Sequence, residues 1–120
     1  MGVINHNAVL AVTWSAEVAV KIRGWIAAKQ VEDKQLFLEH FAPMNGYTTF
    51  ILCPDGSKEG WEESDRGDAL RAAFLEHLGT YDNSDHSSPV EWIEVGFGEF
   101  GQKVLRGNCQ NLHNDREYAI

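Results

Sequence analysis

The chain of 120 residues is poor in cysteine, in proline and in positive charge. Its two cysteines, Cys53 and Cys109, form no CxxC pair, and disulfide scaffolds of this size carry more of them. We therefore expect free thiols in the reducing environment of the cytoplasm. The apolar run nearest the start, residues 8–12, is too short for a signal peptide or a membrane span, so no membrane association is expected.

Positive charge is scarce and unevenly placed. The chain has 10 Lys and Arg against 18 Asp and Glu, a net charge of −8, and residues 32–99 hold fifteen of the acids. No Lys or Arg occurs between Arg71 and Lys103. An excess of negative charge opposes non-specific attraction to phosphate backbones, which argues against a general nucleic-acid binder. A basic protein surface is the natural complement of such a chain.

The length and composition predict one domain. With 43% hydrophobic residues and three prolines, the chain has the composition of a globular protein of ordinary domain size. We expect residues 1–107 to form a single α+β domain and residues 108–120 an irregular polar tail. Strands are predicted at residues 7–14, 47–53, 58–63, 90–97 and 102–106, with helices after Ser15 and at residues 64–79.

Local patterns support these elements. The apolar run at residues 7–14 is typical of a central strand that is buried on both faces. Ser15 stands where a helix N-cap is expected, and residues 31–41 are interpreted as a second short helix. The sequence Pro54, Asp55, Gly56 has turn chemistry, and we expect it to lead by a hairpin into an edge strand at residues 58–63.

The order of these elements predicts a βαββαβ-type, ferredoxin-like fold. This is a two-layer sandwich in which two helices cover one face of an antiparallel or mixed sheet, here with an extra C-terminal strand. The same architecture supports many unrelated activities, so it does not indicate a function.

One glycine-rich segment matches G-x-G-x-x-G through Gly96, Gly98 and Gly101. The motif comes late in the chain and opens no helix, unlike the dinucleotide-binding motif of a βαβ unit. A hairpin whose glycines adopt positive φ is the simpler interpretation. The alternative, a small-molecule or nucleotide binder or enzyme that uses this hairpin as an anion loop, stays open.

Catalytic and metal-binding patterns are weak. Cys53 ends an apolar strand and His77 lies on the apolar face of a predicted helix, where buried structural roles are the ordinary interpretation. Asp82, Asp85 and His86 are close in one loop but lack the spacing of a known metal motif. We expect no catalytic residue, no cofactor and no metal site.

These observations favour a non-enzymatic protein-binding or inhibitory module. Its expected contact surface is acidic and dotted with aromatic side chains. Charge of one sign speeds and orients the encounter with a partner of opposite charge, and aromatic side chains stabilise the complex when they are buried in it. The residues predicted for this surface are Trp61, Glu62, Glu63, Asp65, Asp68, Glu94, Phe97 and Glu99. A basic protein is the expected partner, and the predicted edge strand at residues 58–63 is a further place where a second copy is expected to pair.

Overall fold

A computed structural model describes residues 4–57, 61–85, 87–99 and 101–109. In this part of the chain it forms a single five-stranded sheet with helices against it. The elements are β1 (Asn5–Thr13), α1 (Ala16–Ala27), α2 (Val31–Lys34), β2 (Phe37–Ala42), the 3-10 turn η1 (Met44–Gly46), β3 (Tyr47–Leu52), α3 (Glu62–Gly79), β4 (Val90–Gly98) and β5 (Gly101–Gly107). The predicted α+β class is confirmed.

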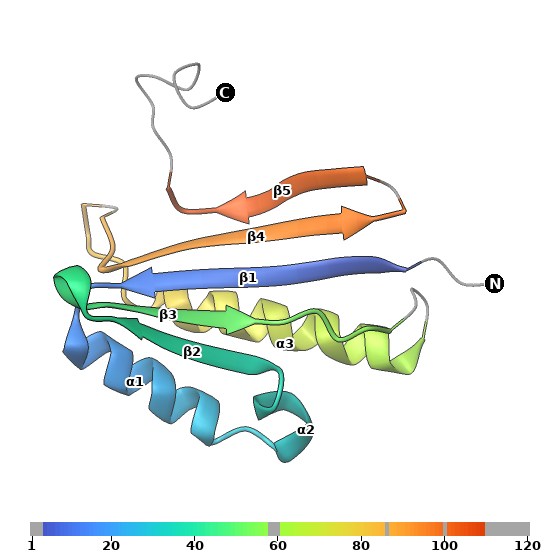
Figure 1. Cartoon of the computed structure of the whole chain (residues 1–120), viewed down its shortest axis with the longest axis horizontal. Coiled ribbons are helices and arrows are strands. Elements are labelled where there is room, and N and C mark those ends of the chain that lie inside the picture. The colour runs from blue at the N-terminus through green and yellow to red at the C-terminus, as the bar shows by residue number, and fades with distance from the viewer. Residues whose placement is uncertain (1–3, 58–60, 86, 100, 110–120) are drawn as a thin grey trace.

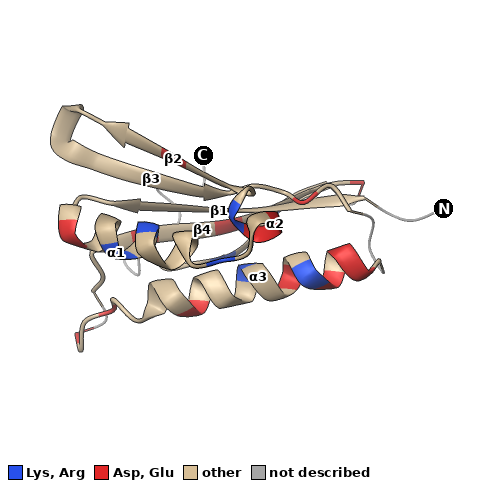
Figure 2. Ribbon diagram, turned by 90° about the horizontal axis from the view of Figure 1, so that it is seen from below, with Lys and Arg blue, Asp and Glu red and all other residues tan. Residues whose placement is uncertain are grey.

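The strands lie in the order β2-β3-β1-β4-β5, and every neighbouring pair is antiparallel. Figure 1 shows the five strands side by side with β5 as the added outer strand. Seen along the sheet, all three α-helices lie on the same side of it, and the other side carries no helix in the described part of the chain (Figure 2). One face of the sheet is therefore covered and the other is open.

Strand β1 is central, as predicted, but it is not buried on both faces. Side chains alternate between the two faces of a strand, and Val9 and Ala11 face the helices with no exposed surface. Leu10 points to the open face and is 37% exposed. The prediction of two buried faces was wrong because apolar runs look the same in a strand covered on both sides and in one whose second face stays open.

Helix α1 begins where its sequence predicts. Ser15 is its N-cap, and the Ser15 hydroxyl accepts a hydrogen bond from the Val18 backbone N–H at 3.2 Å. Ile22 points into the core with no exposure. On the outer side, Arg23 Nε donates to Glu39 Oε1 at 2.9 Å, which ties the helix to the edge strand β2. The Arg23 guanidinium, chiefly through this hydrogen bonding, lowers the pKa of Glu39.

Helix α3 supplies the other half of the core. Leu70, Phe74 and Leu78 recur at helical spacing and are buried against the sheet. Phe74 has no exposed surface and meets two aromatic rings from other elements, Trp25 of α1 at 5.7 Å and Phe37 of β2 at 5.0 Å between centroids. The helix ends at Gly79, as expected.

The predicted helix at residues 31–41 is wrong for most of its length. Helix α2 ends at Lys34, and residues 37–42 form strand β2, which pairs with β3. The strand was missed because it lies at the edge of the sheet and carries large apolar side chains on both faces. Phe37 faces the helices and Leu38 the open side, so period-two alternation is absent from the sequence.

The predicted edge strand at residues 58–63 is also wrong where the structure describes it. Trp61 is the N-cap of α3 and Glu62 is its first helical residue, while residues 58–60 lie outside the described part of the chain. The acids of the first helical turn, Glu62, Glu63 and Asp65, interact favourably with the helix dipole. Among the described strands, β2 and β5 form the edges, and residues 61–63 belong to the start of α3 and not to a strand.

Candidate functional site

The largest apolar feature outside the core is the uncovered side of the sheet, which we call the open face. It consists of the strand residues whose side chains point away from α1 and α3. Its apolar members are Ala8, Leu10 and Val12 of β1, Leu38 and Ala42 of β2, Tyr47 and Ile51 of β3, Ile93, Val95 and Phe97 of β4, and Val104 of β5. Contiguous apolar surface of this kind is uncommon on monomeric domains and makes the open face the candidate interaction site.

The strand register aligns the apolar side chains of the open face in a row. Ile51 and Ile93 both pair with Leu10, one from each side, and Leu38 pairs with Ile51 at the edge. Gly107 of β5 pairs with Ile93 and completes the row without a side chain. Leu38 is 58% exposed at one end of this row and Leu10 is 37% exposed at its centre.

The open face carries almost no charge, although the chain has a net charge of −8. Among its described strand residues Glu91 is the one acid, and the basic side chains of β5, Lys103 and Arg106, point to the helix side. Two histidines, His6 and His40, lie near its rim. The acids of the chain are thus concentrated away from the open face.

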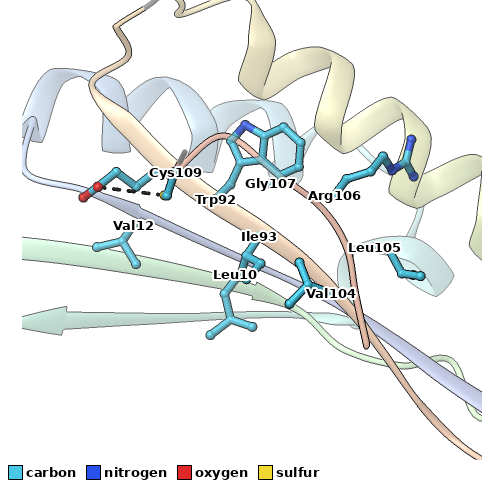
Figure 3. A pocket seen from close by; sticks show the side chains of 10 residues that line it. Leu10, Val12, Trp92, Ile93, Val104, Leu105, Arg106, Gly107 and Cys109 are labelled. Carbon is cyan, nitrogen blue, oxygen red and sulfur yellow. Dashed lines mark hydrogen bonds between the residues drawn. The ribbon is translucent and has the colours of Figure 1, made fainter. Parts of the chain in front are cut away.

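A hollow of about 660 Å³ lies on the open face beside β4 and β5. Figure 3 shows Leu10, Val12, Ile93 and Val104 pointing to the same side, away from the helices. Cys109 lies at the far end of the hollow, where its thiol is 3.9 Å from Glu91 Oε2. Burial, together with the Glu91 charge, raises the pKa of Cys109, so this thiol is not an activated nucleophile.

Glu94, which was predicted for the acidic surface, is instead buried on the helix side with 3% exposure. It accepts a hydrogen bond from Arg106 Nε at 2.7 Å, and its other oxygen lies 3.7 Å from Nε of the buried Arg71. Arg71 also pairs with Asp68 and lies 3.8 Å from Asp55. These charges join β4, β5, α3 and the turn after β3 in one ion-pair network.

The rest of the predicted acidic surface lies in two places. Trp61, Glu62, Glu63 and Asp65 are exposed together at the start of α3, with Trp61 50% exposed. Asp68 is one turn further along the helix and faces Arg71. The remaining two residues, Phe97 and Glu99, lie at the far end of β4, and Phe97 belongs to the open face, where its ring is 5.1 Å from that of His6.

The glycine motif forms the turn end of the β4–β5 hairpin. Gly98 and Gly101 pair across it, with φ of 146° and 91°, values that favour glycine. A Cβ on Gly98 would lie 2.6 Å from the Ile4 carbonyl oxygen, so close backbone approach also requires glycine there. Beside the hairpin lies a cavity of about 140 Å³, lined in part by Asn5, Gly96 and Lys103. The hairpin interpretation explains these glycines without a ligand.

His77 belongs to an aromatic cluster between α1 and α3. Its ring stacks on Trp25 at 4.9 Å, and its Nε2 is 2.9 Å from the Tyr81 hydroxyl. Burial, helped by the Lys29 charge, lowers the pKa of His77 below its ordinary value of 6.5. The His77 ring is thus held in place by stacking on Trp25 and by its contact with the Tyr81 hydroxyl.

The lowered pKa of His77 makes stability depend on pH. The unfolded chain takes up a proton near pH 6.5 while the folded chain resists it, so the His77 contribution is present above that pH and is lost as the pH falls toward the folded pKa. We expect His77→Gln to flatten the loss of stability between about pH 7 and pH 5. Denaturant unfolding of the wild type and of His77→Gln at several pH values measures this. A slope that His77→Gln leaves unchanged would refute the assignment.

The described residues contain neither a cluster of metal-binding side chains nor a helix that could span a membrane. No group of three or more His, Cys, Asp or Glu side chains in that part of the chain is placed to hold a metal ion. Asp85 is held by Ser87 through its backbone N–H and its hydroxyl, and His86 lies outside the described residues. None of the described helices has both the length and the apolar character that crossing a membrane requires.

Sequence reasoning missed the open face as a site. The signal was present in β1 and β4, where apolar side chains occupy both alternating sets of positions. Which of the two sets a helix covers depends on the tertiary structure. Comparison with models of known protein families, with curated proteins and with solved structures finds no match for this chain.

Proposed function

We propose that this protein is a non-enzymatic protein-binding module whose contact surface is the open face of its sheet. The observation that carries the proposal is the row Leu38, Ile51, Leu10 and Ile93, which runs across four strands with nothing packed on it in the described part of the chain. Exposed apolar side chains of this size are costly in water, and burying them against a partner recovers about 25 cal/mol for each Å².

The fold supports this proposal. We interpret the segment from β1 to β4 as a ferredoxin-like unit with β5 added at its edge. Helix α1 connects the parallel strands β1 and β2, which have β3 between them, and α3 connects the parallel strands β3 and β4, which have β1 between them. Such a unit covers one sheet face with its two helices and leaves the other for a partner. Cys53 and Cys109 are both free, which agrees with a cytoplasmic location.

The experiment that tests this function compares two variants as bait. Leu38→Asp places a charge on the open face, and Val31→Asp places the same charge on α2 at similar exposure, 58% against 64%. In extracts of the cells that express the protein, proteins retained by the wild type and by Val31→Asp should be lost with Leu38→Asp. If all three baits retain the same set of proteins, the open face is not the contact surface.

A second candidate surface is the acidic start of α3, where exposed Trp61 lies beside Glu62, Glu63 and Asp65. The negative charge of this second surface is complementary to a basic protein. Binding there would weaken as salt rises, whereas apolar contact at the open face would not. Replacing Glu62 and Glu63 with Gln should weaken binding of a partner at the acidic start of α3 and should not weaken binding at the open face.

A further inference from the structure

From the charge, size and shape of the open face, we infer that its occupant is a second copy of this chain, so that two sheets pack face to face in a symmetric dimer. The inference rests on the proposed function in that both use the same face. It names the partner, which the proposed function does not.

Charge is the first argument. Two copies that each carry a net charge of −8 repel one another through most of their surfaces. The open face adds little to this repulsion, since Glu91 is the one acid among its described strand residues and lies toward its end. Recognition of a basic partner requires an acidic surface, and the open face is not acidic.

The size of the face is the second argument. Five strands, spaced about 4.8 Å apart, make a sheet about 24 Å wide, and strands of six to nine residues are about 20–30 Å long. The resulting plane is about 500–700 Å², and side chains that project from it add to the accessible area. Stable protein interfaces bury about 800 Å² on each partner. With its projecting side chains, the open face therefore comes close to the size of a stable interface.

Self-complementary shape is the third argument. A twofold axis requires each protrusion on one half of the face to meet a recess on the other half. β1 is the middle strand, so an axis along it would place the β2–β3 half of one copy over the β4–β5 half of the other. The β2–β3 hairpin rises away from the helices (Figure 2), and the hollow of about 660 Å³ lies beside β4 and β5.

The same axis gives a consistent pairing of side chains. In the row across the sheet, Leu10 would meet its own copy, Ile51 would meet Ile93, and Leu38 would lie over Gly107. Gly107 has no side chain and lines the hollow, so it leaves room for the protruding Leu38. Sheets packed in this way lie about 10 Å apart, which apolar side chains of this size fill.

The test is sedimentation equilibrium of the purified full chain, under reducing conditions because Cys109 is exposed. We expect a mass twice that of the 13.5 kDa chain, with association that strengthens from about 50 mM to about 500 mM salt as repulsion is screened. Val104→Asp, on the open face at 62% exposure, should raise the dimer dissociation constant by about 30-fold or more. Val20→Asp, on α1 at 60% exposure, is the matched control and should change it less than about twofold.

Several results would overturn the inference. A monomeric mass at all concentrations, or equal effects of Val104→Asp and Val20→Asp, excludes this dimer. If the full chain is monomeric but a shortened chain that ends at Cys109 dimerises, the open face is occupied by residues 110–120 of the same chain and not by a second copy. If the purified chain is monomeric and a different protein is lost with Leu38→Asp bait, the second copy is excluded while the proposed function stands. Where Val104→Asp does not fold, Leu38→Asp with Val31→Asp as control replaces it.

Discussion

Replacing Glu94 with leucine is expected to lower the free energy of unfolding by about 1–3 kcal/mol, because the buried Arg71 loses one of its carboxylate partners and keeps Asp68 and Asp55. Glu94 is 3% exposed and Arg71 is 6% exposed, and Arg71 Nε lies 3.7 Å from the Glu94 carboxylate. Without Glu94, that side of the Arg71 guanidinium faces leucine instead of a carboxylate or water. Urea unfolding of the purified variant at neutral pH measures the loss.

The control is the double variant Arg71→Met with Glu94→Leu. Removing both buried charges also removes the guanidinium that lacks a carboxylate on one side, and apolar replacements of buried ion pairs are often close to neutral. Three groups lose a partner: Asp68 and Arg106 have more than half of their side-chain surface exposed and can bind water, and Asp55, which is 18% exposed, keeps its hydrogen bonds from Ser57. The double variant should therefore be more stable than Glu94→Leu alone. Equal losses in the two variants would show that packing, and not the buried charge, determines the effect.

Replacing Phe74 with alanine is the second change with a large expected effect, a loss of about 3–5 kcal/mol in the free energy of unfolding. Phe74 is fully buried at the point where α1, α3 and β2 meet, and its ring contacts those of Trp25 and Phe37. Alanine would leave a cavity that three elements cannot close without moving. Thermal or denaturant unfolding measures the loss.

Phe41→Ala is the matched control for this prediction, because Phe41 is 57% exposed on β2 and buries little area. Its effect should be about 1 kcal/mol or less. Similar losses for Phe74→Ala and Phe41→Ala would mean that the aromatic cluster does not hold the two helices and the sheet together.

Elements with strong local signals were predicted well. Ser15 caps α1 as predicted, and the turn at Pro54, Asp55 and Gly56 has the expected chemistry, with Ser57 N–H bonded to Asp55 Oδ1 and Gly56 at φ 77°. The other Asp55 oxygen points toward Arg71, over Gly67, where a Cβ would lie only 1.8 Å from it. The turn is thus held against helix α3 by Asp55, and the local sequence pattern does not indicate this long-range contact.

The candidate site was predicted less well than the fold. Trp61, Glu62, Glu63 and Asp65 do lie together, because they are close in sequence on one helix start. Glu94 was assigned to the same surface because charge alone says nothing about burial, and Arg71 and Arg106 reach it only after α3 and β5 pack on β4. The prediction of an acidic, aromatic-dotted contact surface therefore combined exposed carboxylates with a buried one.

The sequence by itself determined the α+β class, the start of α1 at Ser15, the end of α3 at Gly79 and the net charge of −8, because these depend on composition and on local signals along the chain. Only the tertiary structure decided which apolar residues of each strand face the helices and which remain on the open face. Leu10 and Val9 are adjacent and similar in character, yet one is 37% exposed and the other is buried. The reason is physical: α1 and α3 both pack on one side of the sheet, and local sequence does not encode which side that is.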